Sequence, residues 1–160
     1  MADTYQDAKL VPEEVAILEE LEKILGEPIP NRKSSDNLKF GFVAKKKHVL
    51  SLGLSNKKLN SLPQSIGILS ELTELFLSNN NIQELPESIT TLRNLLKLDL
   101  WKNNFSDSSF SKEYIFLVNL HYLEVRGNKN LTETRTFGNY SENSFATKND
   151  VKTFLNRFRK

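Results

Sequence analysis

The residues able to support acid–base, nucleophilic or metal chemistry are few in this 160-residue chain. His48 and His121 lie far apart in the sequence, so we do not expect them to share a metal ion. The absence of cysteine excludes thiol nucleophiles, thiolate metal sites and thioester chemistry. There is also no nucleophile elbow, glycine-rich phosphate loop or His-Glu-x-x-His motif. We therefore expect no enzyme activity, no cofactor and no bound metal.

The charged clusters have simpler interpretations than catalysis. The acids of residues 13–22 are expected on the solvent side of an amphipathic helix. The lysine run at 45–47 fits a solvated turn, and the basic C-terminal sequence RFRK fits a helix end, where cations meet the negative pole of the dipole. We therefore expect binding of neither nucleic acid nor phosphoinositide.

A set of aromatic and charged residues points instead to noncovalent recognition of another protein. The aromatic members are Phe76, Trp101 and Tyr122. The charged members that flank them are Glu74, Lys97, Asp99, Glu124 and Arg126. Aromatic residues and arginine on a rigid surface are the usual anchors of protein interfaces. Two alternatives stay open: the aromatic side chains pack against a neighbouring segment, or the face that carries them self-associates.

An internal repeat must position these side chains. One full copy consists of Leu72, Leu75, Leu77, Asn80, Ile82, Leu85, Pro86, Ile89 and Leu92. A shift of 23 residues in either direction finds similar residue types, and a further copy begins at Leu120, 25 residues after Leu95. The pattern L-x-x-L-x-L-x-x-N-x-L at this period is that of the leucine-rich repeat. In each L-x-L step the leucines point to one side of a short strand, so the residues between them point to the other.

The repeat predicts an α/β fold, a short right-handed solenoid with a curved parallel sheet on its concave face. The repeated asparagine turns the chain out of each strand, and its amide is expected to bond backbone groups of neighbouring copies. Lys57 stands where Asn80 and Asn103 stand in the next copies. Pro63 and Pro86 open the return halves, which are expected to hold single short or 3₁₀ helical turns. The aromatic and charged set then faces the concave surface.

Both ends of such a stack need a cap, because a repeat buries its apolar side only against neighbours. Apolar residues at helical spacing predict a helix over 12–25, followed by a polar linker at 31–37 and a strand antiparallel to the first repeat strand. A second helix is expected to begin at Asn149 or Asp150 and to end at Arg159. We expect one domain over 1–160, divided into a flexible tail at 1–10, an N-terminal cap of helix and strand at 11–47, about four repeats at 48–141 and a C-terminal cap helix at 142–160.

Composition restricts the location of the protein and its partners. Lys plus Arg number 22 and Asp plus Glu number 20, which leaves no strong field to attract nucleic acid or anionic membrane. The N-terminal residues lack the apolar core of a signal peptide, and no apolar run is long enough for a membrane span. Together with the absence of cysteine, these features favour a cytoplasmic location.

The segment LTELFLSNNNIQELPESITTLRNL, residues 72–95, resembles the intracellular leucine-rich-repeat proteins whose return halves read L-P-x-x-I-x-x-L. That class includes plant Ras-group-related proteins, Ras-pathway scaffolds and short prokaryotic or archaeal proteins. The resemblance covers residues 48–131 and implies a scaffold that presents a concave surface to a protein partner. It also implies a small GTPase as a possible partner, since several members work with one and this chain has no nucleotide motif of its own.

These observations predict a non-catalytic protein-interaction module, a scaffold or adaptor that binds its partner on the concave face. The first alternative is a substrate-recognition fragment of a larger enzyme or signalling protein, either ubiquitin-ligase-like or GTPase-linked. The second is a self-assembling structural element. We expect a monomer or a weak homo-oligomer.

Overall fold

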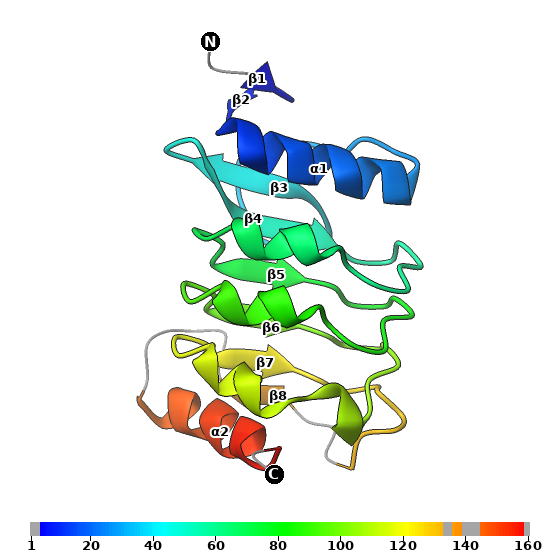
Figure 1. The fold of residues 1–160 in the computed structure, drawn as a ribbon, viewed down its shortest axis with the longest axis vertical. Coiled ribbons are helices and arrows are strands. Elements are labelled where there is room, and N and C mark those ends of the chain that lie inside the picture. The colour runs from blue at the N-terminus through cyan, green and yellow to red at the C-terminus, as the bar shows by residue number, and fades with distance from the viewer. Residues whose placement is uncertain (1–3, 133–135, 139–144, 159–160) are drawn as a thin grey trace.

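The computed structural model describes residues 4–132, 136–138 and 145–158, and a six-stranded sheet runs through its length (Figure 1). The strands follow one another in chain order: β3 (Phe40–Lys45), β4 (His48–Leu54), β5 (Glu74–Phe76), β6 (Lys97–Asp99), β7 (Tyr122–Glu124) and β8 (Thr136–Gly138). Strands β4 to β7 are parallel, and β3 and β8 pair with them antiparallel at the two ends. The predicted α/β class with a parallel sheet is confirmed.

The register of the parallel strands explains the leucine period. Leu52, Leu75, Leu98 and Leu123 lie beside one another on β4 to β7, and all four are fully buried. Because each strand contributes the same repeat position, the leucines stack at the strand spacing of about 4.8 Å. The core is therefore a continuous column of side chains behind the sheet.

The asparagine of each repeat fastens the turn that follows its strand. Asn80 Oδ1 accepts hydrogen bonds from the backbone N–H groups of Lys57 at 2.9 Å and Leu59 at 3.0 Å. Its Nδ2 donates to the carbonyl oxygens of Leu54 at 2.8 Å and Leu77 at 2.9 Å. The asparagines of the next two repeats also join backbone groups of adjacent copies. The role predicted for this position is confirmed.

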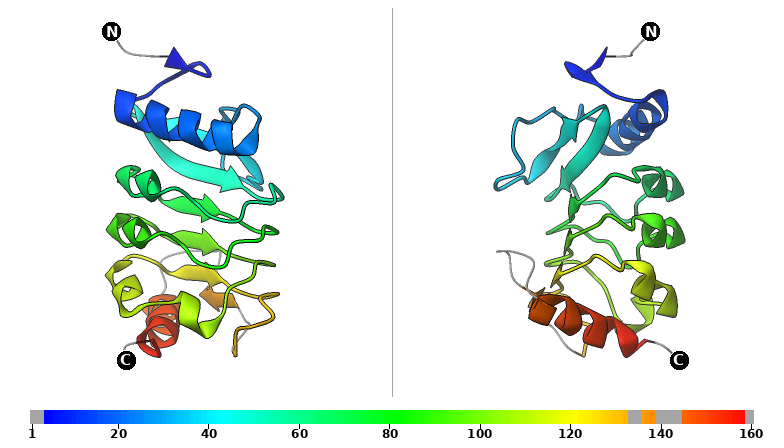
Figure 2. Two further views of the ribbon diagram at one scale, coloured as in Figure 1. Left: turned by 45° about the vertical axis from the view of Figure 1, so that its right-hand side comes forward. Right: turned by 90° about the vertical axis from the view of Figure 1, so that its left-hand side faces the viewer.

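The return halves lie on the other side of the core from the sheet, as the right-hand view of Figure 2 shows. They contain the 3₁₀ helices η1 (Gln64–Ile68), η2 (Glu87–Thr91), η3 (Asp107–Ser109) and η4 (Lys112–Phe116). In η1, Ile66 N–H donates to the Pro63 carbonyl and Leu69 N–H to the Ile66 carbonyl, both at 3.2 Å. These three-residue steps are the 3₁₀ pattern, so the prediction of short helical turns is confirmed.

Helix α1 (Pro12–Leu25) covers the start of the core, and its bounds match the predicted range. Pro12 occupies the first turn, and Gly26 ends the helix at a φ of 73°. The expectation that every acid of this helix faces solvent is wrong for Glu14, which is 2% exposed. Its carboxylate is held by the backbone N–H of Val49 at 2.7 Å and by His48 Nδ1 at 2.9 Å, so burial leaves it with partners.

The flexible tail expected at 1–10 is wrong for residues 4–10, and residues 1–3 lie outside the described residues. Strands β1 (Thr4–Tyr5) and β2 (Ala8–Lys9) form a small antiparallel hairpin. Leu10 is buried, and the ring of Tyr5 lies 5.8 Å from that of Phe42. Apolar contact with the core therefore orders a segment that composition alone had marked as polar.

The C-terminal helix α2 (Phe145–Asn156) begins earlier than predicted, so a start at Asn149 or Asp150 is wrong, and Arg159 lies outside the described residues. Its Phe154 ring packs edge-on against Phe110 at 5.4 Å, which joins the helix to the third return half. The fourth repeat has no return half of the usual kind over 136–138, where β8 pairs with β7 instead. The sequence of that segment shows no strand periodicity.

Candidate functional site

Three rows of side chains cross the helix-free face of the sheet, which is the face that the sequence predicts to be concave. The first row contains Ser51, Glu74, Lys97 and Tyr122. The second contains Gly53, Phe76, Asp99 and Glu124. The third follows the strand ends and contains Ser55, Ser78, Trp101 and Arg126. The structure therefore brings all eight predicted site residues onto one face.

The exposure of the three aromatic side chains differs from the expectation. Trp101 is 38% exposed, but Phe76 is 5% and Tyr122 8% exposed, so the expectation that repeat geometry exposes these two is wrong. Glu124, expected in a polar surround, is 3% exposed. Trp101 is consequently the one predicted aromatic anchor that a partner can reach on this face of the described structure.

The linker before β3 explains the burial of Phe76. Phe76 pairs in register with Gly53, whose missing side chain leaves space beside it. A Cβ atom at Gly53 would lie 2.9 Å from Leu38 Cγ, and the Lys39 carbonyl accepts the N–H of Ser55 at 2.8 Å. The linker therefore crosses the helix-free face here, and Figure 2 shows it projecting from that side at the level of β3.

Strand β8 changes the position of Tyr122 within the sheet. In the repeat pattern alone, Tyr122 belongs to the last strand of the sheet, where one flank is open. In the structure it pairs with Lys97 of β6 on one side and with Gly138 of β8 on the other. Tyr122 therefore lies on an interior strand of the sheet and not at its edge, and its side chain is 8% exposed.

The first row carries an ion pair that is neutralised within the sheet. Lys97 Nζ lies 2.9 Å from one oxygen of Glu74, and Ser51 Oγ donates to the other at 2.9 Å. Burial disfavours ionisation of Glu74, but hydrogen bonds from Ser35, Lys97 and Ser51 outweigh it and hold the pKa of this carboxyl below its usual value. The pair therefore offers a partner little free charge.

A second ion pair joins Glu124 and Arg126. Arg126 Nε lies 3.0 Å from both carboxylate oxygens, Nη2 lies 2.6 Å from one of them, and the Arg126 backbone N–H donates to the other at 2.9 Å. The carboxylate is buried, whereas the arginine side chain is 60% exposed. The acid is thus fully engaged, and the guanidinium presents its remaining edge to solvent.

Asp99 lies between these pairs and is partly buried. Burial is the main cause that raises the pKa of this carboxyl above its usual value, and the neighbouring Glu124 carboxylate adds to the effect. The Trp101 backbone N–H at 2.9 Å, a hydrogen bond from Ser78 and the charge of Arg126 act against it. The Asp99 carboxylate is therefore engaged by groups of its own face.

Lys102, the residue after Trp101 in the sequence, completes the surroundings of the indole. Its Nζ lies 4.3 Å from the centre of the Trp101 ring, a cation–π contact. Its φ of 50° matches the positive φ of Asn56, Asn79 and Gly127 at the same repeat position. Asparagine and glycine favour this conformation and lysine does not, so a comparison of the copies already marks position 102 as unusual.

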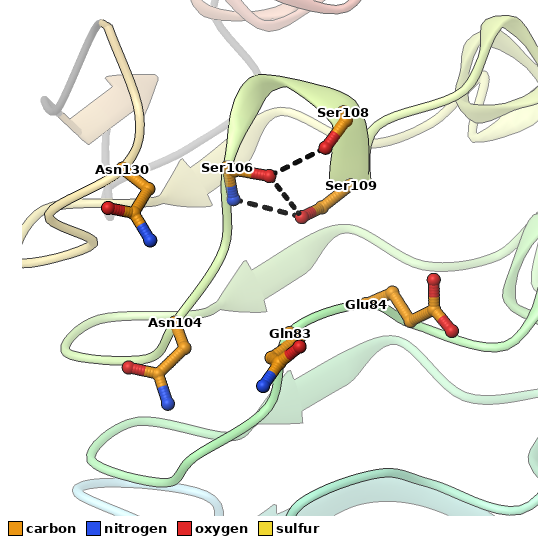
Figure 3. Close-up of a pocket in the computed structure, with 7 residues that line it drawn as sticks. All are labelled: Gln83, Glu84, Asn104, Ser106, Ser108, Ser109 and Asn130. Atoms are coloured by element: carbon orange, nitrogen blue, oxygen red, sulfur yellow. Dashed lines mark hydrogen bonds between the residues drawn. The ribbon is translucent and has the colours of Figure 1, made fainter.

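A recess beside the sheet carries several serine hydroxyls (Figure 3). Its volume is about 380 Å³, and it is lined by Gln83, Glu84, Asn104, Ser106, Ser108, Ser109 and Asn130. Ser106 Oγ lies 2.8 Å from Ser108 Oγ, and Ser109 Oγ accepts the backbone N–H of Ser106 at 2.9 Å. The lining contains no histidine or lysine, and no hydrogen bond joins its one acid, Glu84, to these hydroxyls within the described residues. The recess therefore shows no nucleophile and base pair.

The two histidines are separated in the structure as well. His48 contacts Glu14, and the buried His121 lies 3.4 Å from the Asn119 carbonyl. Over the described residues, no three histidine or acidic side chains are placed to hold a metal ion. Over the same residues, no helix combines the length and the apolar character that crossing a bilayer requires.

Comparison with solved structures agrees with the repeat geometry. The crystal structure of the leucine-rich-repeat ectodomain of the receptor kinase SOBIR1 from Arabidopsis thaliana matches with 25% sequence identity and a TM-score of 0.52, over 76% of this chain and 77% of that one. The chain has a leucine-rich-repeat-like fold. No protein-family model and no curated protein matches the sequence. Leucine-rich-repeat folds serve in general as protein-interaction modules.

Proposed function

We propose that this chain is a non-catalytic scaffold or adaptor that binds a protein partner on its concave, helix-free face, with Trp101 as the anchor. The observation that carries the proposal is the exposed Trp101 indole on a face where Phe76 and Tyr122 are buried. Tryptophan is among the residues most enriched at the energetic centres of interfaces. The leucine-rich-repeat-like fold supports binding of protein in general, while the scaffold role is our inference.

The backbone of Trp101 is held firmly, which suits an anchor. Its N–H donates to Asp99 Oδ1 at 2.9 Å, and its carbonyl accepts the N–H of Asn79 at 2.7 Å. These two hydrogen bonds restrict the backbone of Trp101 before a partner binds, so binding costs little further backbone entropy. A preorganised anchor of this kind reduces the entropic cost of association.

The proposal is tested by affinity capture from a lysate of the source organism with wild type, Trp101→Ala and Phe116→Ala. Phe116 is the matched control, because it is an aromatic side chain 48% exposed on the helical side of the fold. We expect a protein that wild type and Phe116→Ala retain and Trp101→Ala loses. Circular dichroism must show that both variants fold.

Two results would contradict this assignment. A partner lost from Phe116→Ala and kept by Trp101→Ala would place the interface on the helical side, where Ile68 and Val118 are also exposed. Capture of no specific partner, together with a mass that rises with concentration, would favour the self-assembling element. Scattering-detected gel filtration measures that mass.

We propose that α1 with β3, and β8 with α2, close the two ends of a solenoid, and the buried apolar side chains at both ends support this. A small-GTPase partner rests on the sequence resemblance and is tested by direct binding to GTPases loaded with GDP or a GTP analogue. A cytoplasmic location rests on the absence of cysteine and is tested by fractionation.

A further inference from the structure

The exposed charge around Trp101 is positive, although the helix-free face contains three acids. Glu74 is neutralised by Lys97 at 2.9 Å, and the buried Glu124 is engaged by Arg126. Asp99 is partly buried, and its carboxylate accepts the Trp101 N–H at 2.9 Å. Each of the three acids is therefore engaged by a cation or by a backbone donor of the face itself.

Two cations remain directed outward beside the indole. Lys102 is exposed and makes no ion pair within the part of the chain that the structure describes. Arg126 uses Nε and Nη2 for Glu124, and its Nη1 has no partner among the described residues. The guanidinium therefore retains donors for a second carboxylate.

Backbone geometry keeps the two cations and the indole together. The Lys102 N–H donates to the Arg126 carbonyl at 2.9 Å, which joins their strand ends. A Cβ atom at Gly127 would lie 2.8 Å from Lys102 Cγ, so the absent side chain leaves the path along which the lysine stem runs. The lysine then reaches the Trp101 ring, where its ammonium lies 4.3 Å from the ring centre.

We infer that the partner presents an acidic peptide segment here, with carboxylates next to an apolar side chain that packs on Trp101. This inference rests on the function proposed above and adds the chemistry of the partner. The carboxylates would bind Lys102 and Arg126, and the apolar group would cover the indole. Two cations are too few for the alternatives, because nucleic-acid sites contact about 6–10 phosphates and anionic membranes attract clusters of about 4–8 basic residues.

The test uses Trp101 as its own reporter, since it is the single tryptophan of the chain. Three synthetic peptides without tryptophan share a central leucine pair and differ in their flanks, which are aspartate and glutamate, serine and asparagine, or lysine and arginine. We expect the acidic peptide alone to shift Trp101 emission to shorter wavelength, and added salt to weaken the effect. Replacement of the leucine pair by serine should also weaken it.

Charge-reversal variants locate the contact. Lys102→Glu should weaken binding of the acidic peptide by about tenfold, the scale of a lost charge contact at an interface. Lys102→Gln should weaken it less. Lys112→Glu makes the same change on the exposed side of η4 and should leave the affinity unchanged.

Several outcomes would overturn the inference. These are equal or stronger binding of the neutral or basic peptide, an emission shift with none of the three, and an affinity that Lys102→Glu leaves intact. A shift of the same size with single-stranded DNA or phosphatidylserine vesicles, independent of any apolar group, would assign the patch to polyanions instead. If the capture experiment still finds a Trp101-dependent partner, only the acidic chemistry is wrong; if it finds none, the proposed function fails as well.

Discussion

His48 Nδ1 lies 2.9 Å from the carboxylate of Glu14, and this contact ties α1 to the first repeat strand across 34 residues of sequence. The other carboxylate oxygen accepts the N–H of Val49 at 2.7 Å. Glu14 is buried, so its oxygens depend on these partners in place of water. Helix α1 is therefore fixed to the sheet by these hydrogen bonds as well as by its buried apolar side chains.

Replacement of Glu14 by alanine should destabilise the fold by about 1–3 kcal/mol, the cost of leaving a buried donor unpaired. Glu14→Gln keeps an acceptor for the Val49 N–H and should lose less. Urea unfolding measures both, with equal m-values required for the comparison. Exposed Glu13→Ala is the control on the same helix. A loss for Glu14→Ala no larger than that of the control would contradict a structural role for the buried carboxylate.

Asn103 should tolerate neither alanine nor aspartate. Its Nδ2 donates to the Leu77 carbonyl at 2.9 Å and the Leu100 carbonyl at 3.2 Å, and a carboxylate cannot supply these donors. We expect each variant to lose about 1–3 kcal/mol of unfolding free energy. The exposed neighbour Asn104 makes one long side-chain bond, and Asn104→Ala should change stability by less than about 0.5 kcal/mol. Thermal and urea unfolding of the Asn103→Ala and Asn104→Ala variants measure the difference. Equal losses of stability in the two variants would contradict a special role for Asn103.

Gly67 allows two return halves to approach closely. A Cβ atom there would lie 2.6 Å from the backbone oxygen of Ser88 and 2.8 Å from Thr91 Oγ1. Because a backbone atom cannot move aside cheaply, Gly67→Ala should cost about 1–3 kcal/mol. Ser70→Ala, on the exposed side of the same half, serves as the reference. Unfolding curves that coincide for Gly67→Ala and wild type would show that η1 and η2 separate without cost.

Asp99 should make stability depend on pH in the direction opposite to that of a salt-bridged acid. Its folded-state pKa is raised, chiefly by burial, so the folded chain holds the proton more tightly than the unfolded chain. The stability that this tighter proton binding contributes is present at low pH. It is lost as the pH rises from the usual aspartate pKa through the raised pKa of the folded state. Asp99→Asn keeps an oxygen for the Trp101 N–H and removes this loss. The variant should therefore gain stability relative to wild type with rising pH; urea midpoints that stay parallel across the series would contradict it.

The repeat geometry was predictable because its determinants are local. An L-x-L step fixes which side chains enter the core, and the asparagine after it bonds backbone groups within one repeat of itself. Those two features give the parallel sheet and the face on which all eight predicted site residues lie, and the proline-led segments give the 3₁₀ return halves. The placement of Trp101 and its charged neighbours on that face follows from the same periodicity.

The sequence by itself determined the repeats, the strand register and the placement of Trp101 on the helix-free face. Only the tertiary structure decided which of the predicted side chains are accessible. Phe76 is buried because the linker crosses the sheet at Gly53, and the buried Tyr122 lies on a strand that β8 makes an interior one. Neither the linker nor β8 follows the repeat period, since contacts between segments distant in sequence position them. Exposure depends on such non-local packing, which a local residue pattern does not encode.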